Sequence, residues 1–228
     1  MSLSTARQVR RRLLLTGAAG MVVCTSRPGL LGAAEAGRPM APMTEGPFYP
    51  PERWRGRNPV NDNDWDQDLT RVQRGTQVLV ARGEHLALHL RVVDSQGRPI
   101  DRAEVEIWQC DAMAQYRHPG VAAEPGRFDA GFQGFGAARS AADGTVAFRT
   151  IRPVAYPGRT PHIHVKLRHA TFGERTSQLF VAGDPGNARD FLWRSLGAPD
   201  RDALALVLQP AADEALRWTA RHPLVVPA

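Results

Sequence analysis

The feature of this sequence that most constrains its fold is a period-two alternation of apolar and polar residues in short stretches. In the stretch 85–93, the apolar positions of one face are Leu86, Leu88, Leu90 and Val92. Because a strand points successive side chains to opposite faces, such a stretch buries one face and exposes the other. The strands predicted in this way, from Gln77 onward, span 85–93, 103–109, 145–151, 162–168 and 176–182, with 176–182 taken as the last strand.

Turn signals separate these stretches at regular intervals. Asp94–Pro99 and Asp143-Gly144 have the composition of tight turns. Short strands joined by turns predict an all-β fold, namely an antiparallel β-sandwich over residues 76–228. Two amphipathic stretches, 187–196 and 211–221, predict short C-terminal helices. The side chains expected to face the core in the second and fourth strands are Ala103, Val105, Ile107, Ile163, Val165 and Leu167.

Residues 37–75 show no periodicity but carry several aromatic residues. This stretch is rich in Pro, Gly, Asn and Asp, and it includes Tyr49, Trp54 and Trp65. Disordered segments are usually poor in aromatic residues. We therefore expect an ordered N-terminal arm that lies over the sandwich domain.

The first 36 residues have the pattern of an export signal. A basic stretch, Arg7–Arg12, precedes the apolar run Leu13–Val23, and the small-residue site Ala34-Glu35-Ala36 follows. The apolar run is too short and too interrupted by glycine to form a stable membrane anchor. Arg10-Arg11 favours the twin-arginine route, which carries folded proteins, over general secretion. Either route predicts an exported protein, periplasmic or secreted.

The formal net charge of +6 does not indicate a nucleic-acid-binding surface. Five arginines against the single Glu35 place most of this charge in the first 36 residues. The remainder of the chain is nearly balanced, which is too little for a basic face that binds phosphates.

His162-Ile163-His164 is the sharpest local signal of chemistry. Alternate positions of a strand project from one face about 7 Å apart, so both imidazoles can bind the same metal ion. The apolar neighbours Ile163, Val165 and Leu167 then face the core. A pair of surface histidines on an edge strand is the alternative for this motif taken alone.

Two of the three tyrosines, Tyr116 and Tyr156, precede this motif in the chain and could complete a metal site. Tyr156 lies in a loop that leads directly to His162, and Tyr116 precedes it in the chain. A hard trivalent metal displaces the phenol proton, whose ordinary pKa is about 10. Two phenolates with two imidazoles would therefore favour Fe(III) over Zn(II) or Cu(II). For each tyrosine alone, a packed ring with a satisfied hydroxyl is the alternative.

A series of short motifs in a fixed order resembles the intradiol ring-cleavage dioxygenases, which include catechol and protocatechuate dioxygenases. The resemblance runs from about Thr44 to Pro185, and its order is more specific than any single piece. The pieces are Thr44–Tyr49, Gly97–Ile100, Val105–Asp111 with Tyr116 after it, Phe148–Pro153, Tyr156-Pro157, Arg159–His164, Ser177–Phe180 and Gly183–Pro185.

The resemblance implies a role for each site residue. The four ligands of Fe(III) would be Tyr116, Tyr156, His162 and His164. Tyr156 would be the ligand that leaves when the substrate binds. Arg159 would steady negative charge on the ring, Gln178 would line the same pocket, and Pro47 and Phe48 would close over the substrate. The implied reaction uses O₂ to cleave a catechol-type ring between its two hydroxyls, which gives a muconate-type diacid.

The chain departs from the family pattern at several points. Only five residues separate Tyr156 from His162, which is a shorter interval than in the catechol and protocatechuate enzymes. Ala114 stands where those enzymes often have glycine, two residues before the first tyrosine. The helical dimerisation segment of the catechol enzymes has no room before Thr44. The ring substituents of the substrate and the oligomeric state, with a homo-oligomer among the alternatives, therefore stay open.

Two other classes of protein compete with this interpretation. A cupin-type metal enzyme also uses two histidines one residue apart, but it expects a glutamate soon after them, and 165–170 contains none. A transthyretin-like sandwich that binds a partner without chemistry would explain the strands. It would not explain why the tyrosines and histidines occur in family order.

Overall fold

The fold was analysed in a computed structural model that describes residues 37–50, 65–118, 128–213 and 215–228. The predicted export signal, with Arg10, Arg11 and the site at 34–36, lies outside the described residues, and so does Trp54.

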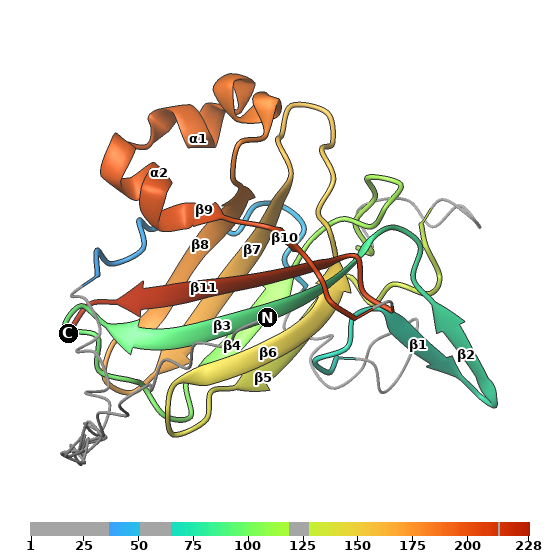
Figure 1. The fold of residues 1–228 in the computed structure, drawn as a ribbon, viewed down its shortest axis with the longest axis horizontal. Helices are drawn as coiled ribbons and strands as arrows, with labels where there is room; N and C mark the ends of the chain where they lie inside the picture. The colour runs from blue at the N-terminus through green and yellow to red at the C-terminus, as the bar shows by residue number, and fades with distance from the viewer. Residues whose placement is uncertain (1–36, 51–64, 119–127, 214) are drawn as a thin grey trace, which may run out of the picture. The chain divides into compact units, whose positions relative to one another are not determined.

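Two sheets form the body of the domain, and a separate hairpin adjoins them (Figure 1). The five-stranded sheet, in the order β5-β4-β7-β8-β9, consists of β4 (Glu104–Trp108), β5 (Phe135–Arg139), β7 (His162–His169), β8 (Gly173–Val181) and β9 (Ala205–Leu206). The four-stranded sheet, in the order β10-β11-β3-β6, consists of β3 (His85–Asp94), β6 (Thr145–Ile151), β10 (Gln209–Pro210) and β11 (Trp218–Val226). The hairpin pairs β1 (Arg71–Arg74) with β2 (Gln77–Val80). This arrangement confirms the predicted β-sandwich.

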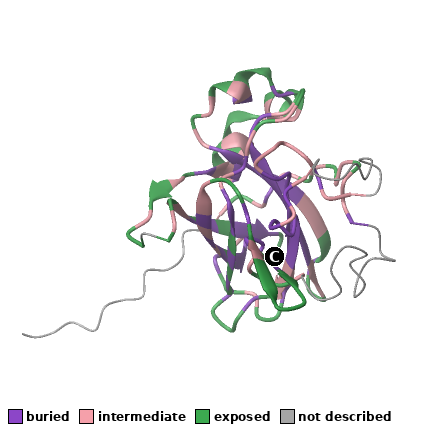
Figure 2. Ribbon diagram, turned by 90° about the vertical axis from the view of Figure 1, so that its right-hand side faces the viewer, coloured by how far each residue is buried: buried purple, intermediate pink, exposed green. Residues whose placement is uncertain are grey.

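Alternation along the strands builds the core as the sequence predicts. In β3, the side chains of Leu86, Leu88, Leu90 and Val92 are at most 1% exposed. The predicted inward residues of β4 and β7 are fully buried as well. Burying one such aliphatic side chain is worth about 1.5–3 kcal/mol, so these two inner faces supply much of the driving force for folding. Buried residues gather along the strands, whereas the helical segment is largely exposed or intermediate (Figure 2).

The helix predicted at 211–221 is wrong, because β10 ends just before this range and β11 begins within it, at Trp218. Strand β11 pairs in parallel with β3, from Trp218 opposite Leu86 to Val226 opposite Asp94. One face of β11 is buried, with Ala220, Leu224 and Val226 facing the core, and burial of this face outweighs the helical pattern of the sequence. The strand 176–182 is consequently not the last one, and the sandwich is antiparallel except for this pair and the short β8–β9 pair.

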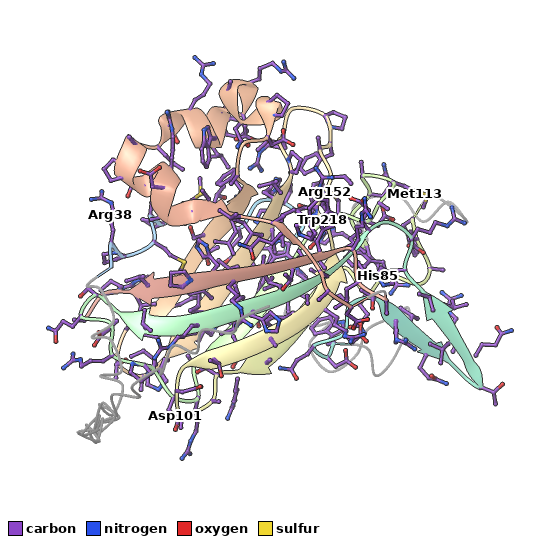
Figure 3. All side chains as sticks on the ribbon, viewed as in Figure 1. Arg38, His85, Asp101, Met113, Arg152 and Trp218 are labelled. Atoms are coloured by element: carbon purple, nitrogen blue, oxygen red, sulfur yellow. The ribbon has the colours of Figure 1, made fainter. Side chains whose placement is uncertain are left out.

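Polar contacts fix the start of β11 against the end of β6. The indole Nε1 of Trp218 donates to the Glu84 carboxylate at 2.8 Å, and Arg152 donates to the same oxygen at 3.2 Å. The Arg152 guanidinium lies 5.3 Å from the Trp218 ring centre, and Figure 3 shows the two side chains at the same end of the sheet. Pro223 is tolerated within β11 because β10 pairs only with Trp218 and Thr219, so that no described strand pairs with this side of β11 at Pro223.

The helical segment lies between β8 and β9 and not at the end of the chain. It comprises the 3-10 helix η2 (Pro185–Arg189), α1 (Phe191–Ser195) and α2 (Ala198–Leu204). The predicted helix at 187–196 covers much of η2 and α1. Asp190 divides it, because its side chain accepts hydrogen bonds from the amides of Leu192 and Trp193 and thereby begins α1.

Sequence patterns missed the hairpin and β5. Strand β1 lies within 37–75, the range assigned to the arm, and β5 lies within the glycine-rich stretch between Ala112 and Ser140. In β5, a Cβ at Gly136 would lie 2.5 Å from the carbonyl oxygen of Asp66, so the glycine admits the neighbouring backbone. This close approach removes a side chain from the alternation that would otherwise have marked the strand.

The first part of the arm, residues 37–50, lies on the sandwich. The Met40 amide donates to the Val225 carbonyl and the Met43 amide donates to the Thr176 carbonyl, each at 2.9 Å. These bonds tie the arm to β11 and then to β8. Among the residues described, no helix is long and apolar enough to cross a membrane.

Candidate metal centre

Strand β7 places His162 and His164 inside the protein. It lies between β4 and β8 in the five-stranded sheet, so it is not an edge strand. Both histidines are 2% exposed, and they project from the face opposite Ile163 and Val165. The alternative of two surface histidines is therefore excluded, and the predicted shared face is confirmed.

The two imidazoles converge on one point. Their Nε2 atoms lie 3.2 Å apart. His162 donates from Nδ1 to the Thr160 carbonyl at 2.6 Å, which leaves the lone pair on Nε2. His164 stacks on Trp108 with ring centres 4.7 Å apart, and its Nδ1 has no hydrogen-bond partner within the described residues. Nitrogen ligands at about 2.0–2.1 Å from a metal that subtend roughly a right angle lie about 3 Å apart.

Burial keeps both imidazoles neutral. Desolvation, with a smaller contribution from the positive charge of Arg159, lowers the pKa of His162 to about 4. Desolvation lowers the pKa of His164 well below its ordinary value, and the neighbouring His162 and Arg159 add to this effect. At neutral pH both rings therefore offer a lone pair, which is the protonation state that metal binding requires.

Tyr116 and Tyr156 approach the same point from two loops. The Tyr116 ring centre lies 6.3 Å from that of His164, and the Tyr156 ring centre lies 5.5 Å from that of His162. The two phenol rings are 5.6 Å apart. Tyr116 is buried, and its hydroxyl makes no hydrogen bond to any residue that the structure describes. Desolvation raises the pKa of both phenols, so a nearby cation is needed to ionise them at neutral pH.

Asp111 shapes the loop that carries Tyr116 away from β4. Its carboxylate accepts hydrogen bonds from the amides of Met113, Gln115 and Asp129. Within this loop, Ala114 adopts a left-handed backbone with φ of 61°. The departure from family glycine at this position therefore falls on a residue whose backbone favours glycine.

A tight turn carries Tyr156 back toward β7. The Arg159 amide donates to the Tyr156 carbonyl at 2.9 Å, and the two residues form an isolated bridge. The turn reverses the chain within four residues, and this explains how only five residues can separate Tyr156 from His162.

Arg159 lies at the centre of a polar network next to the phenol of Tyr156. Its guanidinium donates to the Tyr156 hydroxyl at 3.4 Å and to Oε1 of Gln178 at 2.6 Å. Its Nε donates to the Asp190 carboxylate at 2.8 Å. The structure therefore brings both predicted polar residues, Arg159 and Gln178, to the cluster of tyrosines and histidines.

Asp190 is a site residue that the sequence patterns missed. Its side chain is fully buried and accepts from Arg159 and from the amides of Thr160, Leu192 and Trp193. Burial opposes its charge, but the bonds from these amides and from Arg159 lower its pKa overall. The available signal was its place as an N-cap residue before an amphipathic helix.

The segment of Pro47 and Phe48 reaches the same cluster. The Phe48 ring stacks on Tyr116 with centres 4.4 Å apart, and it lies 6.5 Å from the ring of Tyr156. Pro47 is exposed, and Phe48 is partly buried. Phe48 thus lies against the two tyrosines, and Pro47 precedes it in the chain.

The donor atoms present fit a hard metal ion. Two neutral imidazoles and two phenols face one another in a buried cluster, and the Tyr116 hydroxyl has no partner in the described chain. Within the described ranges, no group of three or more His, Cys, Asp or Glu side chains gathers as an alternative site. Phenolate oxygen with imidazole nitrogen suits Fe(III), whereas structural zinc sites typically use Cys and His.

Comparison with known proteins places the chain in a family. A family model described as Dioxygenase matches residues 55–220. The beta chain of protocatechuate 3,4-dioxygenase from Burkholderia cepacia is 32% identical over 181 residues, which cover 73% of this chain and 72% of that one. The chain belongs to the intradiol ring-cleavage dioxygenase family. Its members are oxidoreductases, and the predicted family and enzyme class are confirmed.

Further relatives match at lower identity. Catechol 1,2-dioxygenase 2 from Acinetobacter lwoffii is 28% identical, and the match covers 73% of this chain but 58% of that enzyme. Among solved structures, the dioxygenase domain of a dioxygenase and carbohydrate-binding protein fusion from Streptomyces sp. SirexAA-E has a TM-score of 0.60 at 25% identity. That match covers 84% of this chain and 99% of that domain. The fold and the family are thus those of the intradiol dioxygenases, and not those of a cupin or a transthyretin-like module.

Proposed function

We propose that this intradiol dioxygenase binds one Fe(III) ion through Tyr116, Tyr156, His162 and His164 and cleaves a catechol-type ring with O₂ between its two hydroxyls. The product is a muconate-type diacid. The observation that carries this proposal is the meeting of two imidazole Nε2 atoms, 3.2 Å apart, with two phenols in a buried cluster.

The protein prepares its ligands in two ways. Desolvation holds His162 and His164 neutral, so that their lone pairs are free at neutral pH. The bond from His162 to Thr160 fixes which nitrogen faces the site, which is a common role for the outer partner of a metal-binding histidine. When bound, iron supplies a Lewis acid that ionises the phenols and holds the two substrate oxygens.

The two tyrosines have different tasks. Tyr116 is 5% exposed and stacked under Phe48, so it is the ligand that stays in place. Tyr156 is less buried, and its hydroxyl accepts a hydrogen bond from Arg159. Tyr156 would therefore be the ligand that the substrate displaces, and its phenolate oxygen would take one proton from the catechol.

Arg159 supplies fixed positive charge beside the bound ring. Asp190 and Gln178 hold the guanidinium on two sides, so it does not reorganise as charge develops. Such preorganised charge stabilises a transition state more than a mobile surface cation does. Phe48, which stacks on Tyr116, would cover the bound ring from the outer side with Pro47 next to it in the chain, and would limit the access of water.

We also propose that the chain is exported, on the basis of Arg10-Arg11 before the apolar run and the small residues at 34–36. Replacing both arginines by lysine should retain the protein inside the cell if the twin-arginine route is used. Unimpaired export of that variant would leave general secretion as the route.

Turnover of a panel of aromatic diols tests the proposed function. The iron-loaded protein should consume O₂ with catechol, and protocatechuate, hydroxyquinol and lignin-derived diols identify the preferred ring substituents. The product should be a ring-opened diacid in which the bond between the hydroxyl-bearing carbons is broken. If the iron-loaded protein binds catechols without consuming O₂, it is a binding module, and the proposed function is wrong.

A further inference from the structure

The second half of β7 carries charge on the same face as the histidines. Lys166 and Arg168 follow His164 at alternate positions, and their side chains are 3% and 25% exposed. Lys166 pairs with Glu45 and with Glu174, and Arg168 pairs with carboxylates on both neighbouring strands. Cations buried to this degree require such partners, since burial of an unpaired charge is costly.

Residues 44–49, which we call the strap, cross this face beside the metal centre. At the beginning of the strap, the Gln178 amide donates to the Thr44 carbonyl at 3.2 Å, and Lys166 donates to the Glu45 carboxylate. Gly46 then passes the ring of His164, where a Cβ would lie 3.6 Å from Cε1. Its φ of +72° lets the chain turn at this point.

The other end of the strap is held through Tyr49. The Tyr49 hydroxyl donates to Glu106 at 2.6 Å and accepts from Arg168 at 2.9 Å. Lys166 lies 4.1 Å from the centre of the Tyr49 ring, which packs edge-on against Trp108. Phe48 is the residue before this anchor, and it stacks on Tyr116.

Neither end of the strap is held by apolar packing alone. Glu106 is 3% exposed and points at both Tyr49 and Arg168. Arg168 bonds both Glu106, at 2.9 Å, and Tyr49, so each of the three side chains is hydrogen-bonded to the other two beside the buried Glu106. Charge-assisted hydrogen bonds of this kind fix geometry more strictly than apolar contact does.

We propose that Tyr49, Glu106 and Arg168 are positioning residues that hold Phe48 against Tyr116 and so set how tightly the ring substrate binds. None of the three is a proposed metal ligand, so they act through the strap and not on the chemistry. The proposal rests on the proposed function for its substrate, but the positioning itself concerns the protein without metal or ligand.

Tyr49→Phe tests the proposal with the smallest change, because the ring stays against Trp108 and only the hydroxyl is lost. In the metal-free protein, amide hydrogen exchange over residues 44–50 should rise above that of the wild type. In the iron-loaded enzyme, KM for catechol should rise about two- to tenfold, the range that one hydrogen bond supports. The value of kcat should stay within about a factor of two, and the iron content should not change.

Glu104→Gln is the matched control. Glu104 also bonds Arg168, at 3.0 Å, but among the described residues it makes no hydrogen bond or ion pair with the strap, and its side chain is 37% exposed. Exchange over 44–50 and KM should both match the wild type. Glu106→Gln should resemble Tyr49→Phe, since it weakens the same anchor without changing shape.

Two results would overturn the proposal. Unchanged exchange over 44–50 in Tyr49→Phe would show that the anchor does not hold the strap, whatever becomes of the proposed function. Raised exchange with an unchanged KM, or a fall in kcat at constant KM, would show that the strap does not govern binding of the ring. A wild-type protein that fails to cleave catechols contradicts the proposed function alone, because the exchange experiment needs neither metal nor substrate.

Discussion

The two halves of strand β7 bury nitrogen groups on one face by opposite means. His162 and His164 are buried with no carboxylate bonded to either ring among the residues described, and desolvation lowers the pKa of both. Lys166 and Arg168, two and four positions further, are paired with carboxylates. The same strand thus carries neutral lone pairs at one end and compensated cations at the other.

This difference teaches how one sheet face can serve two purposes. Burial without counter-charge favours the uncharged form of a group, which is what a metal ligand needs. Burial with counter-charge keeps a cation ionised and gives it directed bonds, which is what an anchor needs. The boundary between the two lies between His164 and Lys166, where Gly46 of the strap passes the His164 ring.

The largest expected effect is a contrast in iron content between two variants, one on each side of this boundary. His164→Ala removes a proposed ligand, and its metal affinity should fall by more than the roughly 10- to 100-fold that outer partners of ligands contribute. Lys166→Met removes an anchor charge but no ligand and should keep its iron. Elemental analysis of both variants after identical purification measures the effect. Equal iron content in the two would contradict the division of β7.

Arg159 tests whether a paired cation near the histidine end acts in catalysis. Arg159→Ala should keep its iron but lose roughly 10²–10³ in kcat, by analogy with other preorganised donors. Arg159→Lys should restore only part of the lost kcat, because an ammonium group cannot copy the planar guanidinium that bonds both Gln178 and Asp190. The kcat of Asp190→Asn should lie between those of the two Arg159 variants. Near-normal kcat in an iron-replete Ala variant would reduce this arginine to a structural ion pair.

His222 tests the effect of burial without counter-charge at a distance from the metal centre. Desolvation lowers its pKa to about 4, and its Nε2 bonds the Ala203 carbonyl. Since the folded pKa lies below the unfolded value of about 6.5, stability is full above pH 6.5 and falls as the pH drops toward 4. The loss from this one group is about 3 kcal/mol. Between pH 7 and pH 4.5, the free energy of unfolding of the metal-free protein, measured in urea, should fall less for His222→Gln than for the wild type. An equal fall in the two proteins would contradict this role of His222.

The backbone at Ala114 gives the smallest effect. Ala114→Gly relieves a left-handed residue in the loop that delivers Tyr116, and it should stabilise the protein by roughly 0.5–1 kcal/mol after the entropy cost of glycine. Arg102, with φ of 54°, is a matched control at a turn away from the site, and Arg102→Gly should behave alike. A loss of stability at Ala114 alone would show that its methyl group has a packing role there.

Much of the sandwich and of the site could be predicted from the sequence, because both depend on alternation. Leu86 to Val92 and His162 to Arg168 each follow a period of two in sequence. The structure buries the apolar face of both stretches, and in β7 it also buries the polar face that carries the histidines. Tyr116 and Tyr156 reach the site through loops, and only their order along the chain marked them.

Other features depend on contacts that the local pattern does not record. The helix predicted at 211–221 overlaps only the first residues of β11. The place of this strand beside β3 comes from a parallel pairing over a long sequence distance. No sequence pattern marks Asp190 as the partner of Arg159, or Tyr49 as the partner of Glu106. Their roles arise only when distant strands bring these side chains together.

The metal content and visible spectrum of the purified wild-type protein, measured beside Tyr116→Phe, test the central claim most directly. The wild type should hold iron in a one-to-one ratio with the chain and show a broad visible band from charge transfer between phenolate and Fe(III). Tyr116→Phe should lose the iron, and the band with it, while remaining folded. A folded, colourless wild type that carries zinc, or a Tyr116→Phe variant with full iron and an unchanged band, would contradict a metal centre built from these tyrosines and histidines.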